Sequence, residues 1–336
     1  MGKVRFVDLE INFADRELAM RVIEDWAERG TFPVQVVYGP EGCGKTAWLR
    51  ESIELFRGRG GFDVIYVNPI DGFIRAELGG IADLRSRILS IAKDALTQEA
   101  WGGRVVWVII NIAREAIEAR VSRLAIIVDD AFQVIGVDKA ALYVKGLLGI
   151  LEHPPAEYER VVTVVATSEG MSLREVGRHN WAEFKPMWNM SKEGFRQLYD
   201  QIPGSKPSLE ETWRLTGGNP RMLEILYKAR WNVDRVVEQL ILEKAITKEF
   251  TTRWRRDLEA TLNDPDHLWI EGGPGGELAN ELVERNLIVY GIPSRSPDLW
   301  IDQPPPERDS ELGIGRYVAW QTPLHREAVK RVLRAT

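Results

Sequence analysis

Apolar runs alternate with amphipathic segments over residues 1–190 of the chain. Five runs rich in β-branched residues predict strands, at residues 34–38, 63–67, 124–128, 161–166 and, with a weaker pattern, 183–188. Between them, apolar residues recur at spacings of three and four, as in residues 84–95, and predict helices. Strands that are almost continuously apolar and are separated by helices indicate a parallel sheet covered on both faces. The first part of the chain is therefore expected to be an α/β domain.

The strand pattern stops near residue 190, and two different patterns follow. Helical periodicity predicts helices at residues 192–201, 208–215, 221–229 and 233–250, which would form a small helical domain. The last part of the chain is mixed, with a helix near 276–285, an apolar run at 287–292, a proline-rich loop, a short strand at 317–320 and a helix at 323–333. This order is consistent with a winged helix. We therefore expect three domains, at residues 1–190, 191–250 and 251–336.

Composition and charge exclude several classes of protein. With 44% hydrophobic and 28% charged residues, the 336-residue chain has the composition of a soluble globular protein. No apolar run is long enough to span a bilayer, and residues 1–10 lack the apolar centre of a secretory signal, so we expect a cytoplasmic protein without a membrane partner. The single cysteine cannot form a disulfide framework, and the net charge of −6 disfavours indiscriminate binding to nucleic acid.

A glycine-rich motif between the first predicted strand and a helix carries the strongest signal. The sequence Gly39-Pro40-Glu41-Gly42-Cys43-Gly44-Lys45-Thr46 fits the pattern G-x-x-x-x-G-K-[ST]. Glycines let the backbone turn so that its N–H groups converge on phosphate oxygens, and the dipole of the following helix favours the same negative charge. We expect this loop and Ala47 to bind a nucleotide, with Lys45 on the β- and γ-phosphates and the Thr46 hydroxyl on Mg²⁺. The alternative is a chance glycine turn before a helix.

Polar residues at the ends of two other predicted strands extend this site. Asp129 and Asp130 follow the third predicted strand, where Asp129 would hold Mg²⁺ and Asp130 would act as a base or position a water molecule. Asp130 could instead cap the next helix. The fourth predicted strand ends in Thr167 and Ser168, which are suited to sensing the γ-phosphate or orienting water, or belong to an ordinary turn.

Four motifs in order give the chain a family resemblance. They are residues 13–17 (Phe-Ala-Asp-Arg-Glu), the loop at residues 39–46, residues 126–133, and the stretch Thr216-Gly217-Gly218-Asn219-Pro220-Arg221. On these motifs the chain resembles an archaeal-type ATPase of the STAND branch of P-loop NTPases, related to AAA+ proteins. The resemblance implies an ASCE P-loop domain with the strand order 5-1-4-3-2, followed by a helical lid domain and a C-terminal winged helix.

The resemblance also implies roles for residues outside the loop. Arg16 and Glu17 would lie near the adenine or the ribose. Pro220 would pack against the base, and Arg221 would contact the phosphates. Taken alone, the Gly-Gly-Asn-Pro sequence is also a helix boundary with Pro220 in the first turn. In related proteins an arginine after the fourth strand faces the nucleotide of a neighbouring subunit, and we take Arg178 for this arginine finger; a solvated helix residue is the alternative.

The combined expectation is a Mg²⁺-dependent ATPase that binds ATP or ADP, hydrolyses ATP slowly and acts as a nucleotide-controlled conformational switch. Archaeal members often carry Asp-Glu where this chain has Asp129-Asp130, and the shorter side chain would hold an attacking water less well. A protein partner or a second copy of the chain would read the switch. A nucleotide kinase with the same loop is disfavoured, because no second arginine-rich phosphate site accompanies the loop.

The alternative function is that of a DNA-associated AAA+-like ATPase whose winged helix binds duplex DNA. Phosphate contacts need a cationic face, and two clusters supply candidate residues: Arg253, Arg255 and Arg256, and Arg326, Lys330, Arg331 and Arg334. The same residues can form an ordinary solvated face, and acidic residues outnumber basic ones from residue 245 onward. We therefore favour the switch over the DNA-binding protein.

Overall fold

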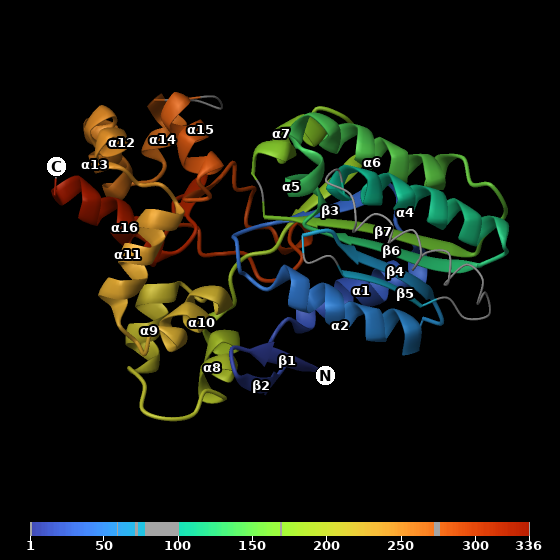
Figure 1. Cartoon of the computed structure of the whole chain (residues 1–336), viewed down its shortest axis with the longest axis horizontal. Coiled ribbons are helices and arrows are strands. Elements are labelled where there is room, and N and C mark those ends of the chain that lie inside the picture. The colour runs from blue at the N-terminus through green and yellow to red at the C-terminus, as the bar shows by residue number, and fades with distance from the viewer. Residues whose placement is uncertain are drawn as a thin grey trace. The chain divides into compact units, whose positions relative to one another are not determined.

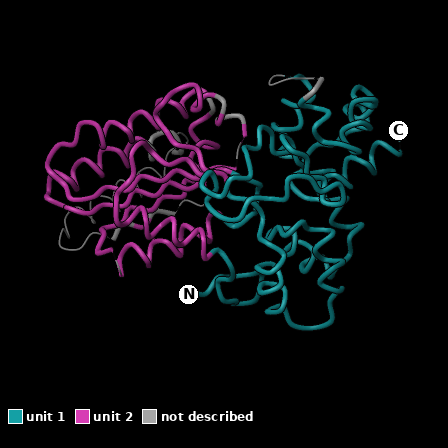
Figure 2. The backbone as a smooth tube through the Cα atoms, turned by 180° about the vertical axis from the view of Figure 1, so that it is seen from behind, with its two compact units in different colours: residues 1–16, 39–44, 187–336 teal, residues 17–38, 45–186 magenta. Residues whose placement is uncertain are grey.

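The computed structural model describes residues 2–58, 60–70, 73–77, 101–168, 170–271 and 276–335. These residues form two compact units, which Figure 2 shows in different colours. The sheet unit consists of Glu17–Tyr38 and Lys45–Pro186, and the C-terminal unit consists of Met1–Arg16, Gly39–Gly44 and Met187–Thr336. The division into three domains at residues 190 and 250 stays a prediction. The predicted helix at residues 84–95 lies outside the described residues.

The sheet unit is built on strands that run mostly parallel. They are β3 (Val34–Tyr38), β4 (Asp63–Asn68), β5 (Phe73–Glu77), β6 (Arg123–Asp129), β7 (Arg160–Thr167) and β8 (Ala182–Pro186). Their order in the sheet is β5-β4-β6-β7-β3-β8, with β5 antiparallel to β4 and the other pairs parallel. The predicted strands therefore follow the predicted order 5-1-4-3-2, which confirms the ASCE arrangement. Parallel pairing brings the carboxyl ends of β3, β6 and β7 to one edge of the sheet.

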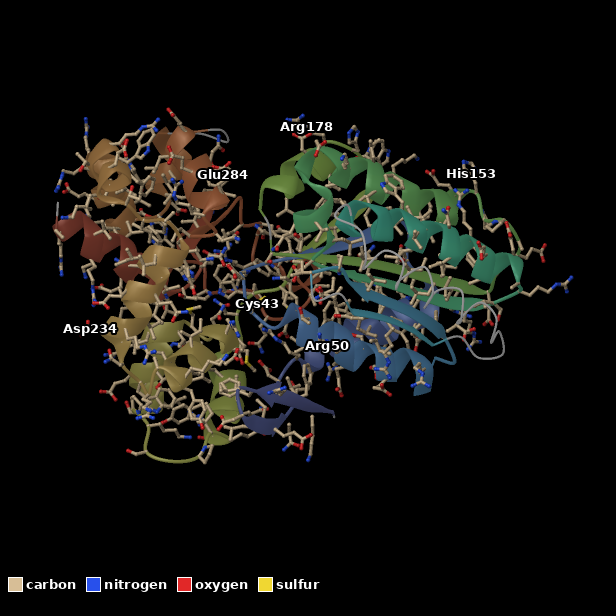
Figure 3. All side chains as sticks on the ribbon, viewed as in Figure 1. Cys43, Arg50, His153, Arg178, Asp234 and Glu284 are labelled. Atoms are coloured by element: carbon tan, nitrogen blue, oxygen red, sulfur yellow. The ribbon has the colours of Figure 1, made fainter. Side chains whose placement is uncertain are left out.

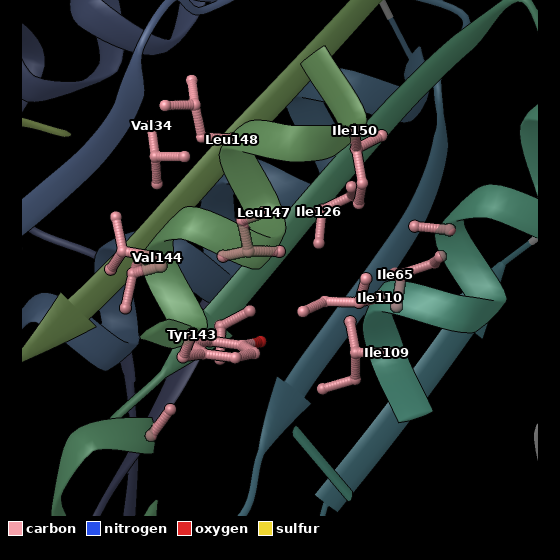
Figure 4. Close-up of a cluster of buried hydrophobic side chains, with 14 of the residues drawn as sticks. Val34, Ile65, Ile109, Ile110, Ile126, Tyr143, Val144, Leu147, Leu148 and Ile150 are labelled. Atoms are coloured by element: carbon pink, nitrogen blue, oxygen red, sulfur yellow. The ribbon is translucent and has the colours of Figure 1, made fainter. Parts of the chain in front are cut away.

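Helices cover both faces of this sheet (Figure 1). One face carries α1 (Glu17–Arg29) and α2 (Lys45–Gly58); the other carries α4 (Trp101–Glu118), α5 (Ala131–Ile135) and α6 (Val137–Glu152), and α7 (Met171–Gly177) packs on α6. Figure 4 shows the core under α4 and α6, where buried side chains of strands and helices meet, among them Val34, Ile65, Ile126, Ile110, Tyr143 and Leu147. Apolar burial contributes about 25 cal/mol per Å². This core fixes the strand ends that carry the candidate site.

The C-terminal unit begins with a hairpin of β1 (Lys3–Phe6) and β2 (Leu9–Asn12), which packs on α8. Its helices are α8 (Lys192–Asp200), α9 (Leu209–Thr216), α10 (Pro220–Lys228), α11 (Val233–Glu243) and α12 (Lys248–Arg253). The structure thus divides the single helix predicted at residues 233–250 into α11 and α12. The division occurs because Ala245 has a positive φ of 48° and Thr247 caps α12 by accepting a hydrogen bond from the Phe250 N–H.

Residues 255–320 have an order of helices and strands that is consistent with the predicted winged helix, and we call them the winged-helix region. The region begins with three helices, α13 (Arg255–Asn263), α14 (His267–Glu271) and α15 (Glu277–Glu284). Two antiparallel strands follow, β9 (Ile288–Tyr290) and β10 (Val318–Trp320), with the 3-10 helix η1 (Pro297–Leu299) between them in the sequence. The helix α16 (Pro323–Arg334) comes after β10. Buried Asp266 ties the helices to the hairpin, because its carboxylate accepts hydrogen bonds from three successive N–H groups, those of Arg316, Tyr317 and Val318. No helix in the described ranges is both long and apolar enough to cross a membrane.

A buried histidine of α16 predicts that stability depends on pH. His325 is 1% exposed, and burial, together with the charge of Lys244, lowers its pKa to about 3 against the opposing effect of Glu41. The folded chain therefore keeps His325 neutral, whereas the unfolded chain binds a proton there below pH 6.5. The stability contributed by the neutral ring is complete above pH 6.5 and is lost as the pH falls from 6.5 toward 3.

We expect the variant His325→Asn to lose less stability in acid than the natural chain. Asparagine can keep a hydrogen bond to Thr322, whose hydroxyl lies 2.8 Å from His325 Nδ1, but it has no proton to bind. Between pH 7 and pH 4.5 the free energy of unfolding should fall by about 2 to 3 kcal/mol more in the natural chain than in the variant. Urea unfolding at both pH values measures this difference. Equal losses would contradict the prediction.

Candidate functional site

The chain passes from the C-terminal unit to the sheet unit between Gly44 and Lys45, so each unit contains one part of the glycine-rich motif. In the sheet unit, Lys45 and Thr46 begin α2, and Tyr38 ends the parallel strand β3. The strand and helix that the motif requires are therefore present. Lys45 is 5% exposed, which is unusual for a lysine, and its charge acts on the neighbouring Asp129 carboxylate.

Asp129, the last residue of β6, is the buried acid of this half of the site. One carboxylate oxygen, Oδ2, accepts hydrogen bonds from the Tyr66 hydroxyl at 2.9 Å and from Asn68 Nδ2 at 3.3 Å, both on the neighbouring strand β4. The other oxygen, Oδ1, is buried and has no hydrogen-bond partner among the described residues. A buried carboxylate oxygen without a partner is costly, so a ligand at this position would be favourable.

The electrostatics of Asp129 point the same way. Burial and the neighbouring charge of Asp130 raise the pKa of Asp129 to about 6, although the Thr46 and Tyr66 hydroxyls and the charge of Lys45 act to lower it. The structure therefore brings together Asp129, Thr46 and Lys45, which the sequence analysis placed in one site. Tyr66 and Asn68 were not predicted. Their only sequence signal is a tyrosine and an asparagine in an otherwise apolar strand that ends at the same edge of the sheet.

Asp130 lies beside Ser168, at the ends of the neighbouring strands β6 and β7. The Ser168 hydroxyl donates to Asp130 Oδ1 at 3.2 Å and in turn lies 3.1 Å from Gln133 Nε2. Asp130 has a positive φ of 52° and makes no capping hydrogen bond to α5, so its side chain is not used as a helix cap. Thr167, the predicted residue next to Ser168, is fully buried. The more accessible polar group at this strand end is therefore the half-buried Ser168 hydroxyl.

The predicted arginine finger lies at the surface of the sheet unit. Arg178 follows α7, and its side chain is 68% exposed and pairs with Glu175 at 3.2 Å (Figure 3). The structure does not bring Arg178 to the group around Asp129. Its role as an arginine finger stays a prediction.

In the C-terminal unit, Arg16 holds the backbone of the glycine-rich loop. Its guanidinium is buried and donates through Nη2 to the Cys43 carbonyl at 2.5 Å and to the Trp188 carbonyl at 3.0 Å, while Nη1 pairs with Asp302 at 2.6 Å. The predicted contacts of Arg16 and Glu17 with the adenine or ribose stay predictions. What the structure shows is that Arg16 binds the loop itself.

Residues of the lid motif also contact the loop. Asn219 Nδ2 donates to the Glu41 carbonyl at 2.9 Å, and the Arg221 N–H donates to the Gly42 carbonyl at 3.3 Å. Gly42 has a φ of 74°, and a Cβ atom on it would lie 2.1 Å from the Cβ of Arg221, so only glycine fits here. Pro220 begins α10, as its sequence position indicated, and the Arg221 side chain pairs with Glu224 at 2.6 Å.

Two further residues of the C-terminal unit, Lys244 after α11 and Gln321 after β10, contact the loop. Gln321 Oε1 accepts a hydrogen bond from the Glu41 N–H at 2.6 Å, and Lys244 pairs with the Glu41 carboxylate at 2.6 Å. At the start of the loop, a Cβ atom on Gly39 would lie 1.9 Å from the Met187 carbonyl oxygen. Asn219 belongs to a motif that the sequence marks, although no role was predicted for it. Gln321, Lys244 and Asp302 were not predicted as site residues, because no local pattern marks a partner that lies far along the chain.

Comparisons with known proteins identify a family for this chain. Residues 13–226 match the family model for an ATPase domain predominantly from Archaea. No curated protein matches the chain. Similar solved structures include the ORC2 protein of Aeropyrum pernix in ADPNP-ADP complexes, at 13% identity and a TM-score of 0.44 over 98% of each chain. They also include the ORC1 protein of the same organism in complex with DNA, at 16% identity and a TM-score of 0.40, over 96% of this chain and 93% of that one.

Cdc6p from Pyrobaculum aerophilum is similar at 14% identity and a TM-score of 0.39, over 95% of this chain and 93% of that chain. With TM-scores below 0.5, these likenesses carry no argument about what this chain binds. The family match is different in kind, because it spans well over half of the 336 residues and includes the glycine-rich loop, the acidic strand end and the lid motif. The chain therefore belongs to the family of ATPase domains found predominantly in Archaea.

Proposed function

We propose that this ATPase is Mg²⁺-dependent, hydrolyses ATP slowly, and uses the bound nucleotide to control the conformation of its C-terminal unit. The observation that carries the proposal is the arrangement around Asp129. A buried carboxylate oxygen without a hydrogen-bond partner among the described residues is grouped with the Thr46 hydroxyl and the Lys45 ammonium, the kinds of group that bind a triphosphate and its metal ion.

The residues present fit Mg²⁺. This ion prefers oxygen ligands and is usually held by one or two carboxylates together with waters and substrate phosphates. Asp129 Oδ1 and the Thr46 hydroxyl supply such oxygens, and the described part of the chain has no cluster of three or more His, Cys, Asp or Glu that would form a dedicated metal cage. When bound, Mg²⁺ would neutralise charge that develops on the phosphate oxygens.

The remaining roles follow from the chemistry of each group. Lys45 would bind oxygens of the β- and γ-phosphates, and the N–H groups of Gly42 and Gly44 to Ala47 would bind the phosphates through the backbone. The Glu41 N–H donates to Gln321, the Cys43 N–H donates to the Pro40 carbonyl, and Pro40 has no N–H. Asp130 would accept a hydrogen bond from the attacking water, and Thr167 and Ser168 would lie near the γ-phosphate. Pro220 and Arg221 would contact the nucleotide from the lid.

Control of the C-terminal unit is supported by its contacts to the loop. Phosphates would bind to the N–H groups of this segment, while its successive carbonyls at Glu41, Gly42 and Cys43 are hydrogen-bonded within the C-terminal unit. A change in the loop on nucleotide binding or release would therefore alter the packing of that unit, which is the requirement for a switch. A protein partner or a second copy of the chain, reached through exposed Arg178, would read the change.

The slow rate gives a direct prediction. The Asp130 carboxylate is one methylene shorter than glutamate and already accepts a hydrogen bond from Ser168, so a water would be held weakly. We expect a turnover number below about 1 s⁻¹ with Mg²⁺ and saturating ATP, against a typical enzyme value of about 10 s⁻¹. The variant Asp130→Glu should be several-fold faster. Steady-state phosphate release tests both, and a natural chain that turns over tens of ATP per second would contradict the prediction.

Retention of ADP during purification gives a second test of the proposed switch. A switch that is closed at rest should retain ADP through purification, and heating the purified chain and chromatographing the released small molecules would detect it. An empty chain that nevertheless hydrolyses ATP slowly would argue against retention as the resting state.

The hydrogen bond from Tyr66 to Asp129 predicts an effect on the metal requirement. Without the Tyr66 hydroxyl, Asp129 Oδ2 loses its 2.9 Å donor, so Oδ1 is less firmly oriented. We expect Tyr66→Phe to need about tenfold more Mg²⁺ for half-maximal ATP hydrolysis. The matched control is Tyr143→Phe, because the buried Tyr143 hydroxyl has no partner among the described residues. Equal Mg²⁺ requirements in the two variants would show that Tyr66 does not orient Asp129 for the metal ion.

DNA binding is the less supported alternative. In the described structure, cationic residues of both candidate clusters are engaged within the protein: Arg253 pairs with Glu281 and Glu277, Arg255 with Glu259, Lys330 with Glu327, Arg331 with Asp234, and Arg326 donates to the carbonyls of Ser310 and Leu262. Paired charges contribute little to a phosphate-binding face. A salt-dependent affinity for duplex DNA would revive this alternative.

A further inference from the structure

The ion pair between Arg16 and Asp302 is the most deeply buried charged contact of the glycine-rich loop. The two side chains are 4% and 5% exposed, and each charge would be costly without the other. The guanidinium fork divides its donors, with Nη1 on Asp302 and Nη2 on the carbonyls of Cys43 and Trp188. Arg16 also has a positive φ of 75°, a conformation that a residue other than glycine keeps only when its surroundings fix it.

Asp302 is held by a rigid surrounding. It lies two residues beyond Trp300, in the connection between β9 and β10, and residues 300–302 are buried. Trp300 packs edge-on against Trp188 in an apolar cluster that also contains Ile292, Leu312, Ile314 and Ala319. Asp302 therefore presents its carboxylate to Arg16 from a fixed position, and the Trp188 carbonyl that Arg16 also binds belongs to the same cluster.

The Cys43 carbonyl matters because of the planarity of the peptide bond. The Cys43 C=O and the Gly44 N–H share one planar trans peptide, so an arginine that fixes the carbonyl also fixes the opposite direction of the N–H. The two preceding peptides are held in the same way. The backbone N–H of Arg221 donates to the Gly42 carbonyl, and the side-chain amide of Asn219 donates to the Glu41 carbonyl. Three successive carbonyls are thus held. Of the N–H groups that follow them, the one of Cys43 donates to the Pro40 carbonyl at 3.2 Å, so the groups whose direction is set for a ligand are those of Gly42 and Gly44.

We propose that the Arg16–Asp302 pair is a latch that sets the direction of the loop N–H groups, and that Asp302 in the winged-helix region is a positioning residue for nucleotide binding. The second part rests on the proposed function, in which these N–H groups bind phosphates. Loss of the latch would free the Cys43–Gly44 peptide to rotate, and the loop would open more often and bind phosphate less well.

Cys43 offers a direct probe of the latch. It is the single cysteine of the chain, and its side chain is fully buried next to the held carbonyl (Figure 3). A buried thiol reacts only when its segment opens, so the rate of reaction with dithiobis-nitrobenzoate measures opening of the loop. Without nucleotide, we expect Asp302→Asn to react at least about tenfold faster than the natural chain, because the guanidinium loses its charged anchor.

The matched control is Asp266→Asn. Asp266 is also a buried aspartate of the C-terminal unit that pairs with an arginine, Arg308, but its hydrogen bonds go to the wing and not to the loop. We expect this variant to lose stability in urea while its thiol reacts within about twofold of the natural rate. Equal acceleration by both variants, or none by Asp302→Asn, would overturn the latch.

A second variant guards against failure of Asp302→Asn to fold. Replacing the pair together, as Arg16→Met with Asp302→Leu, leaves no unpaired charge in the interior and should preserve folding. It still removes the donor to the Cys43 carbonyl, so the same acceleration of thiol reaction is expected. A folded double variant with a natural reaction rate would refute the latch.

Nucleotide binding tests the positioning role of Asp302 separately from the latch. We expect fluorescent ADP to bind Asp302→Asn about tenfold more weakly, with a raised KM for ATP and a nearly unchanged kcat. Natural affinity in a variant with a reactive thiol would overturn the positioning role. Failure of the natural chain to bind ADP or ATP would refute the proposed function, while accelerated thiol reaction in Asp302→Asn would still support the latch.

Discussion

Replacing Lys45 with alanine should weaken the binding of ATP by about 100-fold. The Lys45 side chain is 5% exposed and begins α2, so its ammonium has little freedom and would meet the phosphates without a large loss of conformational entropy. A hydrogen bond to a charged group contributes about 1.5 to 3 kcal/mol, and each 1.4 kcal/mol changes affinity tenfold. The alanine variant also leaves the Asp129 charge facing the phosphates without a compensating cation. Titration calorimetry with Mg²⁺ and ATP measures the loss.

Lys145→Ala serves as the control for this variant. Lys145 lies in the same unit, pairs with Glu152 at 2.8 Å and is 42% exposed, so its removal changes the net charge equally without touching the motif. ATP affinity should stay within about twofold of the natural value in this control. If Lys45→Ala also bound ATP within about threefold of the natural chain, the glycine-rich loop would not be a phosphate site.

Asp129→Asn should separate stability from activity by moving them in opposite directions. We expect Mg²⁺-dependent hydrolysis to fall by about 1,000-fold, because the amide cannot neutralise or orient the metal ion. Metal-free stability should rise instead. The pKa of Asp129 is raised to about 6 from 3.8, so above pH 6 the ionised carboxylate costs the folded chain up to about 3 kcal/mol, which the neutral amide avoids.

Two measurements check this prediction. Urea unfolding at pH 8 in the presence of a chelator should show Asp129→Asn to be more stable than the natural chain, with the difference vanishing as the pH falls toward 4. Phosphate release with Mg²⁺ should show the loss of activity. The neighbouring variant Asp130→Asn should slow hydrolysis without changing the Mg²⁺ requirement. A less stable Asp129→Asn, or one that keeps its activity, would show that Asp129 has another role.

The order of the sheet could be predicted because the signals are local. The strands that carry the site are buried on both faces and therefore read as continuous apolar runs, as in Val34–Tyr38 and Arg123–Asp129. The strands that were not predicted are short. Leu9–Asn12 buries one of its four residues, and Phe73–Glu77 forms the edge of the sheet, so neither produces a clear period.

The residues of the candidate site also fall into those that a local sequence pattern marks and those that it does not. Lys45, Thr46 and Asp129 are marked by their positions at the ends of apolar strands and in a glycine-rich pattern. Asp302 and Gln321 lie 286 and 280 residues from their partners, Arg16 and Glu41, and nothing in the surrounding sequence distinguishes them from other polar residues of a loop. Contacts of this kind are decided by packing of the whole C-terminal unit, which a single sequence does not specify locally.

The interleaving of the two units along the chain has a consequence for synthesis on the ribosome. Chains emerge from their N-terminus, and domains generally fold as units during translation. Here the segment Gly39–Gly44 belongs to the same unit as Met187–Thr336. The residues that hydrogen-bond to this segment are therefore synthesised much later than the segment itself, and the last of them is Gln321. A nascent chain that stalls before that glutamine would already contain the complete glycine-rich motif, yet its loop would lack the hydrogen bond from the Glu41 N–H to Gln321.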